Sequence, residues 1–105
     1  MKTKEEIVST LRSLKPKYAS EGFTILGLFG SYARNEATEK SDIDILYDLD
    51  DRIFLEKYKG FSAVNRLASI KDELKAVFHT DIDIADVTTL NKVGKKYILP
   101  DTLYV

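Results

Sequence analysis

The chain has 105 residues, of which 44% are hydrophobic and 31% charged, and this size and balance predict one globular domain over residues 1–105. Because it contains no cysteine, disulfides, a thiol nucleophile and thiolate zinc sites are excluded, and a cytoplasmic location is expected. The net charge of −1 gives no broad basic surface, which argues against an enzyme that tracks an extended nucleic-acid template.

No apolar run approaches the roughly 20 residues of a membrane span. The segment that follows Met1 lacks the apolar region of a signal peptide. We therefore expect the mature protein to begin at Met1 and to have no contact with a membrane.

The first predicted element is an amphipathic helix from residue 4 to about residue 19. Thr3 and Glu6 form a capping box, and apolar residues then recur at helical spacing. Pro16 removes a backbone hydrogen bond, so we expect this helix to kink or to end near Lys15.

A buried strand and a short helix are predicted next. The mostly apolar run Phe23–Phe29 suits a buried strand, and Gly30 and Ser31 end it. Residues 32–37 are good helix formers without proline, so we expect one or two helical turns there with Ser31 as the N-cap.

The second predicted strand, residues 42–47, carries two acids. Alternation of polar and apolar residues at its start places Asp42 and Asp44 on one face and directs the intervening isoleucine toward the core. Residues 48–51 form a solvated turn whose acids are also candidate N-caps.

Apolar residues over 53–78 recur every three or four positions, which predicts a long helix with one buried stripe and a candidate break at Gly60. Residues 81–85 repeat the alternation of the second strand. We expect an α+β fold in which helices pack on one face of a small mixed β-sheet.

The last elements are a turn and a lysine-bearing helix over residues 87–99, with Thr88 or Thr89 as the N-cap. Pro100 ends this helix. Residues 102–105 are rich in β-formers and predict a short final strand.

Asp42 and Asp44 are the first candidates for chemistry. At a rise of roughly 3.3 Å per residue they stand about 7 Å apart along the strand, and their oxygens could bind two metal ions ~3.5–4 Å apart. Hard oxygen ligands favour Mg²⁺ or Mn²⁺. The alternative is that both acids merely line the wet face of an edge strand.

The turn at Gly30 and Ser31 is a candidate phosphate site. Glycine lets the backbone approach a phosphate, and a helix N-terminus presents free N–H groups to it. Arg34, one turn further on, can add a guanidinium. The alternative is a plain strand-to-helix turn capped by Ser31.

A third carboxylate comes from the later acidic strand. Asp83 could share one ion and accept the proton of an attacking hydroxyl. Asp81 lies on the same strand face and remains an alternative. His79 is expected to act as a helix cap or surface group.

Together these features resemble the nucleotidyltransferase palm of the DNA polymerase beta superfamily. The segments Phe29-Gly30-Ser31-Tyr32-Ala33-Arg34 and Ser41-Asp42-Ile43-Asp44-Ile45 are similar to the motif of its minimal nucleotidyltransferase (MNT) branch, and the order of elements is similar over nearly the whole chain. The resemblance implies that Gly30 and Ser31 bind nucleotide phosphates, that Asp42 and Asp44 are metal ligands, and that Asp83 is the third carboxylate.

The resemblance also implies an activity. ATP would be the substrate, two Mg²⁺ ions the cofactors, with Mn²⁺ as an alternative, and AMP would be transferred to a tyrosine of a HEPN-type ribonuclease toxin, for which this chain would be the antitoxin. The motif departs at Asn35, where the family usually has glycine; asparagine tolerates a left-handed backbone, so the turn should survive with an altered fit. The alternatives are a module that neutralises its partner by contact alone and a nucleotide sensor without transfer.

Overall fold

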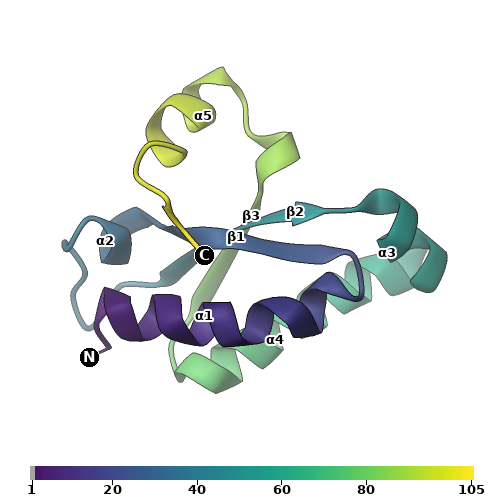
Figure 1. Ribbon diagram of the computed structural model, residues 1–105, viewed down its shortest axis with the longest axis horizontal. Coiled ribbons are helices and arrows are strands. Elements are labelled where there is room, and N and C mark those ends of the chain that lie inside the picture. The colour runs from purple at the N-terminus through teal and green to yellow at the C-terminus, as the bar shows by residue number, and fades with distance from the viewer. Residues whose placement is uncertain (1) are drawn as a thin grey trace.

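A four-stranded mixed sheet forms the centre of the computed structural model, which describes residues 2–105 (Figure 1). The predicted α+β class is confirmed. No helix of the described residues is long and apolar enough to span a membrane. In chain order the elements are α1 (Lys4–Ala19), β1 (Phe23–Phe29), α2 (Gly30–Ala33), β2 (Ile43–Leu49), α3 (Asp51–Lys57), α4 (Phe61–Phe78), β3 (Ile82–Asp86), the 3-10 turn η1 (Val87–Thr89), α5 (Lys92–Ile98) and β4 (Leu103–Tyr104).

The strand order across the sheet is β3-β2-β1-β4. β1 is antiparallel to both β2 and β4, whereas β2 and β3 are parallel. A parallel pair needs a long crossover, and the segment containing α3 and α4 provides it. The register of this pair places Ile43 opposite Ile82 and Ile45 opposite Ile84.

Helices α1 and α4 run along one face of the sheet, as predicted, and α5 stands on the other side of the strands (Figure 1). The core lies between the sheet and the two long helices. Its fully buried members include residues of α1, β2 and α4, namely Ile7, Leu11, Ile43, Ile45, Ile70 and Leu74. The strand face that alternates with these isoleucines therefore points away from α1 and α4.

Helix α1 spans Lys4–Ala19, which confirms the predicted range of residues 4 to about 19, and it does not end near Lys15 as Pro16 had suggested. Packing explains why its last turn persists. Tyr18 is only 1% exposed, and its ring meets that of Phe23 edge to face at 5.9 Å between centroids. Burial of this aromatic side chain compensates for the backbone hydrogen bond that proline cannot donate.

The long helical segment is divided at Gly60, as the sequence suggested. Gly60 has a φ of +59°, a conformation that ends regular helix, and α3 and α4 lie on either side of it. Asp50 caps α3 by accepting a hydrogen bond from the backbone N–H of Ile53 at 3.3 Å. His79 is the left-handed C-cap of α4, in agreement with the capping role expected of it.

The N-cap of α5 is Asn91, so the expectation of Thr88 or Thr89 is wrong. The Asn91 side chain accepts a hydrogen bond from the Gly94 N–H at 2.8 Å. Thr88 instead donates both its backbone N–H and its hydroxyl to Asp86 Oδ1, at 2.9 and 2.7 Å, within η1. Thr88 therefore hydrogen-bonds to Asp86 and does not cap α5.

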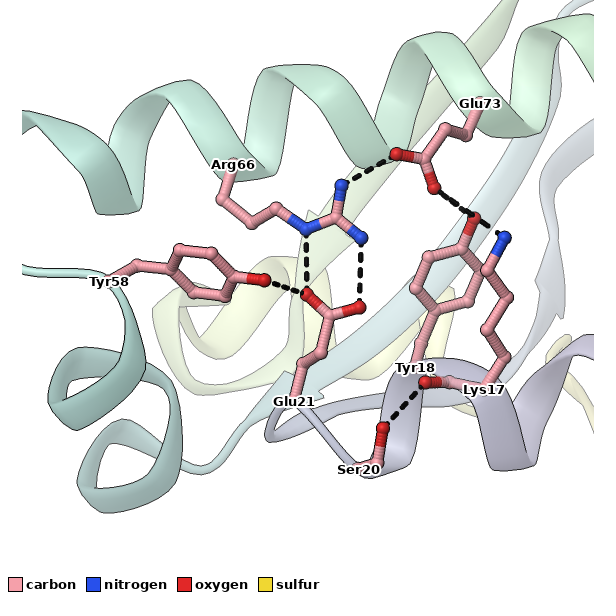
Figure 2. A network of polar contacts seen from close by, with 7 residues as sticks. All are labelled: Lys17, Tyr18, Ser20, Glu21, Tyr58, Arg66 and Glu73. Atoms are coloured by element: carbon pink, nitrogen blue, oxygen red, sulfur yellow. Dashed lines mark hydrogen bonds and ion pairs between the residues drawn. The ribbon is translucent and has the colours of Figure 1, made fainter.

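A polar network closes the end of the domain where α1 turns into β1 (Figure 2). The Arg66 guanidinium of α4 binds both carboxylate oxygens of Glu21, at 2.7 and 2.8 Å, and Glu73 at 2.6 Å. Tyr58 donates its hydroxyl to Glu21, and Tyr18 donates to Glu73 at 2.8 Å. Arg66 thus connects α4 to the turn between α1 and β1, and Tyr58, which follows α3, joins the same network.

The Arg66 guanidinium, helped by Tyr58, lowers the pKa of Glu21 to about 2, although burial of the carboxyl opposes this shift. Glu21 is only 7% exposed, so the charge is not relieved by solvent. Since one pKa unit corresponds to roughly 1.4 kcal/mol, ionised Glu21 contributes on the order of 3 kcal/mol to folding.

Arg66→Met is expected to lower the free energy of unfolding at pH 7 by about 3 kcal/mol, because it leaves a buried carboxylate unpaired. The folded pKa of Glu21 lies below its ordinary value of 4.5, so the contribution is present above pH 4.5 and is lost as the pH falls toward 2. Urea denaturation should show the difference between variant and wild type shrinking from pH 7 to pH 3. An equal difference at both pH values would contradict this account.

Candidate active site

Two neighbouring strands bring acidic side chains together on the face of the sheet that points away from α1 and α4. Asp44 of β2 stands directly opposite Asp83 of β3 in the parallel register. Asp42 immediately precedes β2, two residues before Asp44 and hence on the same side of the strand. The structure thus gathers all three carboxylates that the sequence singled out.

The electrostatics of Asp44 reflect this crowding. Burial of the half-buried carboxyl, followed by the charges of Asp83 and Asp42, raises its pKa to about 6, while Arg34 acts in the opposite direction. Three acids within electrostatic range of each other repel when ionised. A divalent cation between them would remove this repulsion.

Asp81, the alternative third carboxylate, has a different environment. Its side chain lies 2.8 Å from Lys75 Nζ, and the hydrogen bond from this ammonium group is the main cause that lowers the pKa of Asp81. Asp83 raises the pKa of Asp44 and is in register with it, whereas its own nearest cation, Lys71 Nζ, is 3.9 Å away. This arrangement favours Asp83 as the third carboxylate.

Gly30 lies at the end of β1, where Phe29 pairs with Asp44, and it has a φ of +76°. A Cβ on Gly30 would overlap Oδ2 of Asp44 and come within 2.9 Å of its Cγ. The glycine therefore leaves space for the carboxylate beside the turn.

Helix α2 begins at Gly30, so the expected start at residue 32 with Ser31 as the N-cap is wrong. The N-cap is Phe29, and no side chain caps this end of the helix. The left-handed glycine lets the chain enter the helical turn directly from the strand. Ser31 consequently lies inside the first turn, next to the glycine that leaves space for Asp44.

Arg34 follows α2, close enough to Asp44 to influence its charge. Its Nε donates to Glu36 Oε2 at 3.1 Å, and both side chains are substantially exposed. A guanidinium held in this way through Nε keeps its other N–H groups available for a phosphate.

Asn35 has a φ of +60°. This is the left-handed conformation that we expected the turn to keep with asparagine in place of the family's usual glycine. Its N–H bonds to the carbonyl of Tyr32 at 3.3 Å, which closes the turn. The backbone is thus preserved without glycine.

The donor chemistry of the site suits a hard divalent cation, because the three side chains on this face of β2 and β3 are all carboxylates. Within residues 2–105, no three acidic or histidine side chains are grouped closely enough to hold a metal ion as they stand. The backbones of Asp44 and Asp83 are nevertheless adjacent in the register of the two strands.

An open hollow of about 400 Å³ lies beside Asp42 and Asp81. It provides access from solvent to Asp42 and to the Asp81–Lys75 ion pair. The lining residues are Glu39, Lys40, Ser41, Asp42, Lys75, His79, Thr80 and Asp81.

In-register acids on a parallel strand pair, next to a glycine turn that opens a helix, define a nucleotidyltransferase palm. The family model for polymerase beta nucleotidyltransferases matches residues 6–103, and the chain belongs to this family. The resemblance inferred from the motif is therefore confirmed, and nucleotidyl transfer is the class of activity that the family supports.

Several relatives are similar over the full length of the chain. It is 37% identical to a protein of Methanocaldococcus jannaschii provisionally named protein adenylyltransferase MJ0126, with all of both chains covered. It is 32% identical to protein adenylyltransferase MntA of Thermococcus cleftensis, of which 98% is covered. A solved structure described as a candidate minimal nucleotidyltransferase has the same fold, with a TM-score of 0.73 over 99% of this chain and 97% of that one at 22% identity.

Gly30→Ala should displace the Asp44 carboxylate and reduce Mn²⁺ affinity at least tenfold, as measured by titration calorimetry. Gly60→Ala is a matched control, because Gly60 also has a positive φ but nothing lies within 4 Å of the position that a Cβ would take there. Both variants should lose roughly 1–2 kcal/mol of stability from backbone strain. Equal Mn²⁺ affinity in the two variants would show that overlap of a Cβ at position 30 with the Asp44 carboxylate does not affect metal binding.

Asn35→Gly is expected to change ATP binding by less than about threefold, since glycine adopts the same left-handed backbone. Asn35→Ala should destabilise the fold by roughly 1 kcal/mol, because alanine is strained at this φ. Thermal denaturation with and without ATP measures both effects. A large gain in ATP binding with glycine would mean that the asparagine side chain itself impairs the site.

Proposed function

We propose that this protein is a metal-dependent nucleotidyltransferase that transfers AMP from ATP to a hydroxyl group of another protein. The observation that carries the proposal is the register pairing of Asp44 with Asp83 beside the Gly30 turn. This pairing supports the proposal, because phosphoryl transfer requires metal ligands next to a phosphate site.

The residues divide between two tasks in this proposal. Gly30, Ser31 and Arg34 bind the phosphates of ATP, through backbone N–H groups, a hydroxyl and a guanidinium. Asp42, Asp44 and Asp83 would hold two Mg²⁺ ions, or Mn²⁺, which supply charge stabilisation to the attacking and leaving oxygens. Asp83 also accepts the proton of the attacking hydroxyl.

The acceptor is proposed to be a tyrosine of a HEPN-type ribonuclease toxin, with the present chain as the cytoplasmic antitoxin. The names of the adenylyltransferase relatives support a protein acceptor, and the MNT resemblance supports this partner.

A contact-only module is the second candidate, because Asn35 replaces the usual glycine of the motif. The left-handed φ of Asn35 weighs against it, since the turn keeps the shape that a glycine would give. A nucleotide sensor without transfer would show ATP-dependent thermal stabilisation with no release of pyrophosphate.

Label from [α-³²P]ATP should pass to the purified protein encoded by the neighbouring gene when Mg²⁺ is present. Asp42→Ala combined with Asp44→Ala should reduce the transfer at least 100-fold, because the metal ligands are lost. Asp83→Ala should have a comparable effect, whereas Asp81→Ala, two residues away, should retain transfer within about threefold. No transfer by the wild type, or undiminished transfer by the double variant, would refute the proposed nucleotidyltransferase activity.

A further inference from the structure

Helix α5 carries an exposed surface that the proposed chemistry does not use. Val93 and Tyr97 are 63% and 64% exposed and lie one helical turn apart, on the same side of the helix. Exposed lysines flank them, and within residues 2–105 none of these lies within ion-pair distance of an acid. These residues, Lys92, Val93, Lys95, Lys96 and Tyr97, are called the α5 surface below.

The α5 surface is on the same side of the sheet as the candidate site. Figure 1 shows α5 across the strands from α1 and α4. The strand that carries Asp83 ends at Asp86 and continues through η1 into α5. A protein bound to α5 would therefore lie on the side of the sheet to which the acids point.

Hydrogen bonds at both ends fix the helix in this position. Asn91 caps its start, as described above. At its other end the buried Thr102 donates its hydroxyl to the carbonyl of Ile98 at 2.8 Å, and Tyr104 donates to that of Leu99 at 3.3 Å. The outer side of α5 thus has a defined orientation while its apolar side chains remain exposed.

We infer that the α5 surface docks the protein acceptor, through an acceptor segment in which acidic side chains surround an apolar one. This inference rests on the proposed function and names the surface that function would use. Unpaired lysines attract acids of a partner and steer its approach, whereas an exposed valine and tyrosine supply apolar contact. Tyrosine is also among the residues that contribute most to binding when buried at an interface.

A second exposed apolar side chain provides a control. Phe61 is 89% exposed, more than Tyr97, but it is the first residue of α4. Figure 1 shows α4 on the other side of the strands from α5. If apolar exposure alone determined where the acceptor binds, Phe61 would be the stronger candidate. Position relative to the acids favours α5.

The test uses the full chain and the purified protein encoded by the neighbouring gene. Lys92→Glu combined with Lys96→Glu should raise the dissociation constant, measured by calorimetry, at least tenfold. The same variant should raise the KM for this acceptor while kcat changes less than twofold. Tyr97→Ala should weaken binding at least fivefold. Lys92→Arg with Lys96→Arg should retain wild-type affinity, and ATP-induced thermal stabilisation should be unchanged in all variants.

Arg52→Glu with Lys59→Glu makes the same change in charge at the α3 end, and Phe61→Ala is the matched apolar control; both should bind as wild type. Equal weakening by these controls, wild-type affinity in the α5 variants, or no binding by the wild-type chain would overturn the inference. The inference would also be overturned if the α5 variants bound the protein as wild type does and lost binding to poly(A) RNA or to phosphatidylserine vesicles. Binding that depends on α5 without any label transfer would support docking while refuting the enzyme.

Discussion

The parallel pairing of β2 with β3 is the constraint on which the rest of the structure depends. Ile43 and Ile45 face the two long helices and are fully buried, and burial of each such side chain contributes roughly 1.5–3 kcal/mol. A slip of one residue would turn these side chains out of the core. Apolar packing thereby sets the register that places Asp44 opposite Asp83, and it does so against the repulsion between the acids. Burial of the Asp44 carboxyl, followed by the charges of Asp83 and Asp42, raises its pKa.

The surroundings of the acids determine how they can be used. Gly30 supplies space rather than a contact, since a Cβ there would occupy the position of the Asp44 carboxylate. Arg34 supplies positive charge, and Lys75 pairs with Asp81 at 2.8 Å. Asp83 is opposite Asp44, and Lys71 Nζ lies 3.9 Å from its carboxylate. Each carboxylate is distinguished from its neighbours by the partners that the fold provides, although all lie on two short strands or immediately before them.

Apolar patterns, together with β-propensity for the last strand, were sufficient to predict every strand, the long helices and the acid-bearing face, because these patterns follow from burial. The helix starts at Ser31 and at Thr88 or Thr89 were predicted wrongly, since the capping choice depends on a left-handed glycine in one case and on Asp86 in the other. The Arg66 network was missed altogether. One signal was available: Arg66 lies three residues after Ala63 and four before Ile70, on the buried stripe of its helix, where an arginine requires a partner. Its partner Glu21 is too distant in sequence to be identified from spacing.

The pairing of β1 with β4 has a consequence for how the chain folds. β1 is an almost wholly apolar strand in the interior of the sheet. Its residue Gly27 pairs with Tyr104, from which it is separated by most of the sequence. Contacts between distant residues form late because the intervening loop must first be closed. Until then one edge of β1 presents unpaired backbone groups to the solvent, and such an edge can pair with another chain. During refolding, aggregation should therefore begin at β1, and the short strand β4 protects the molecule by covering that edge.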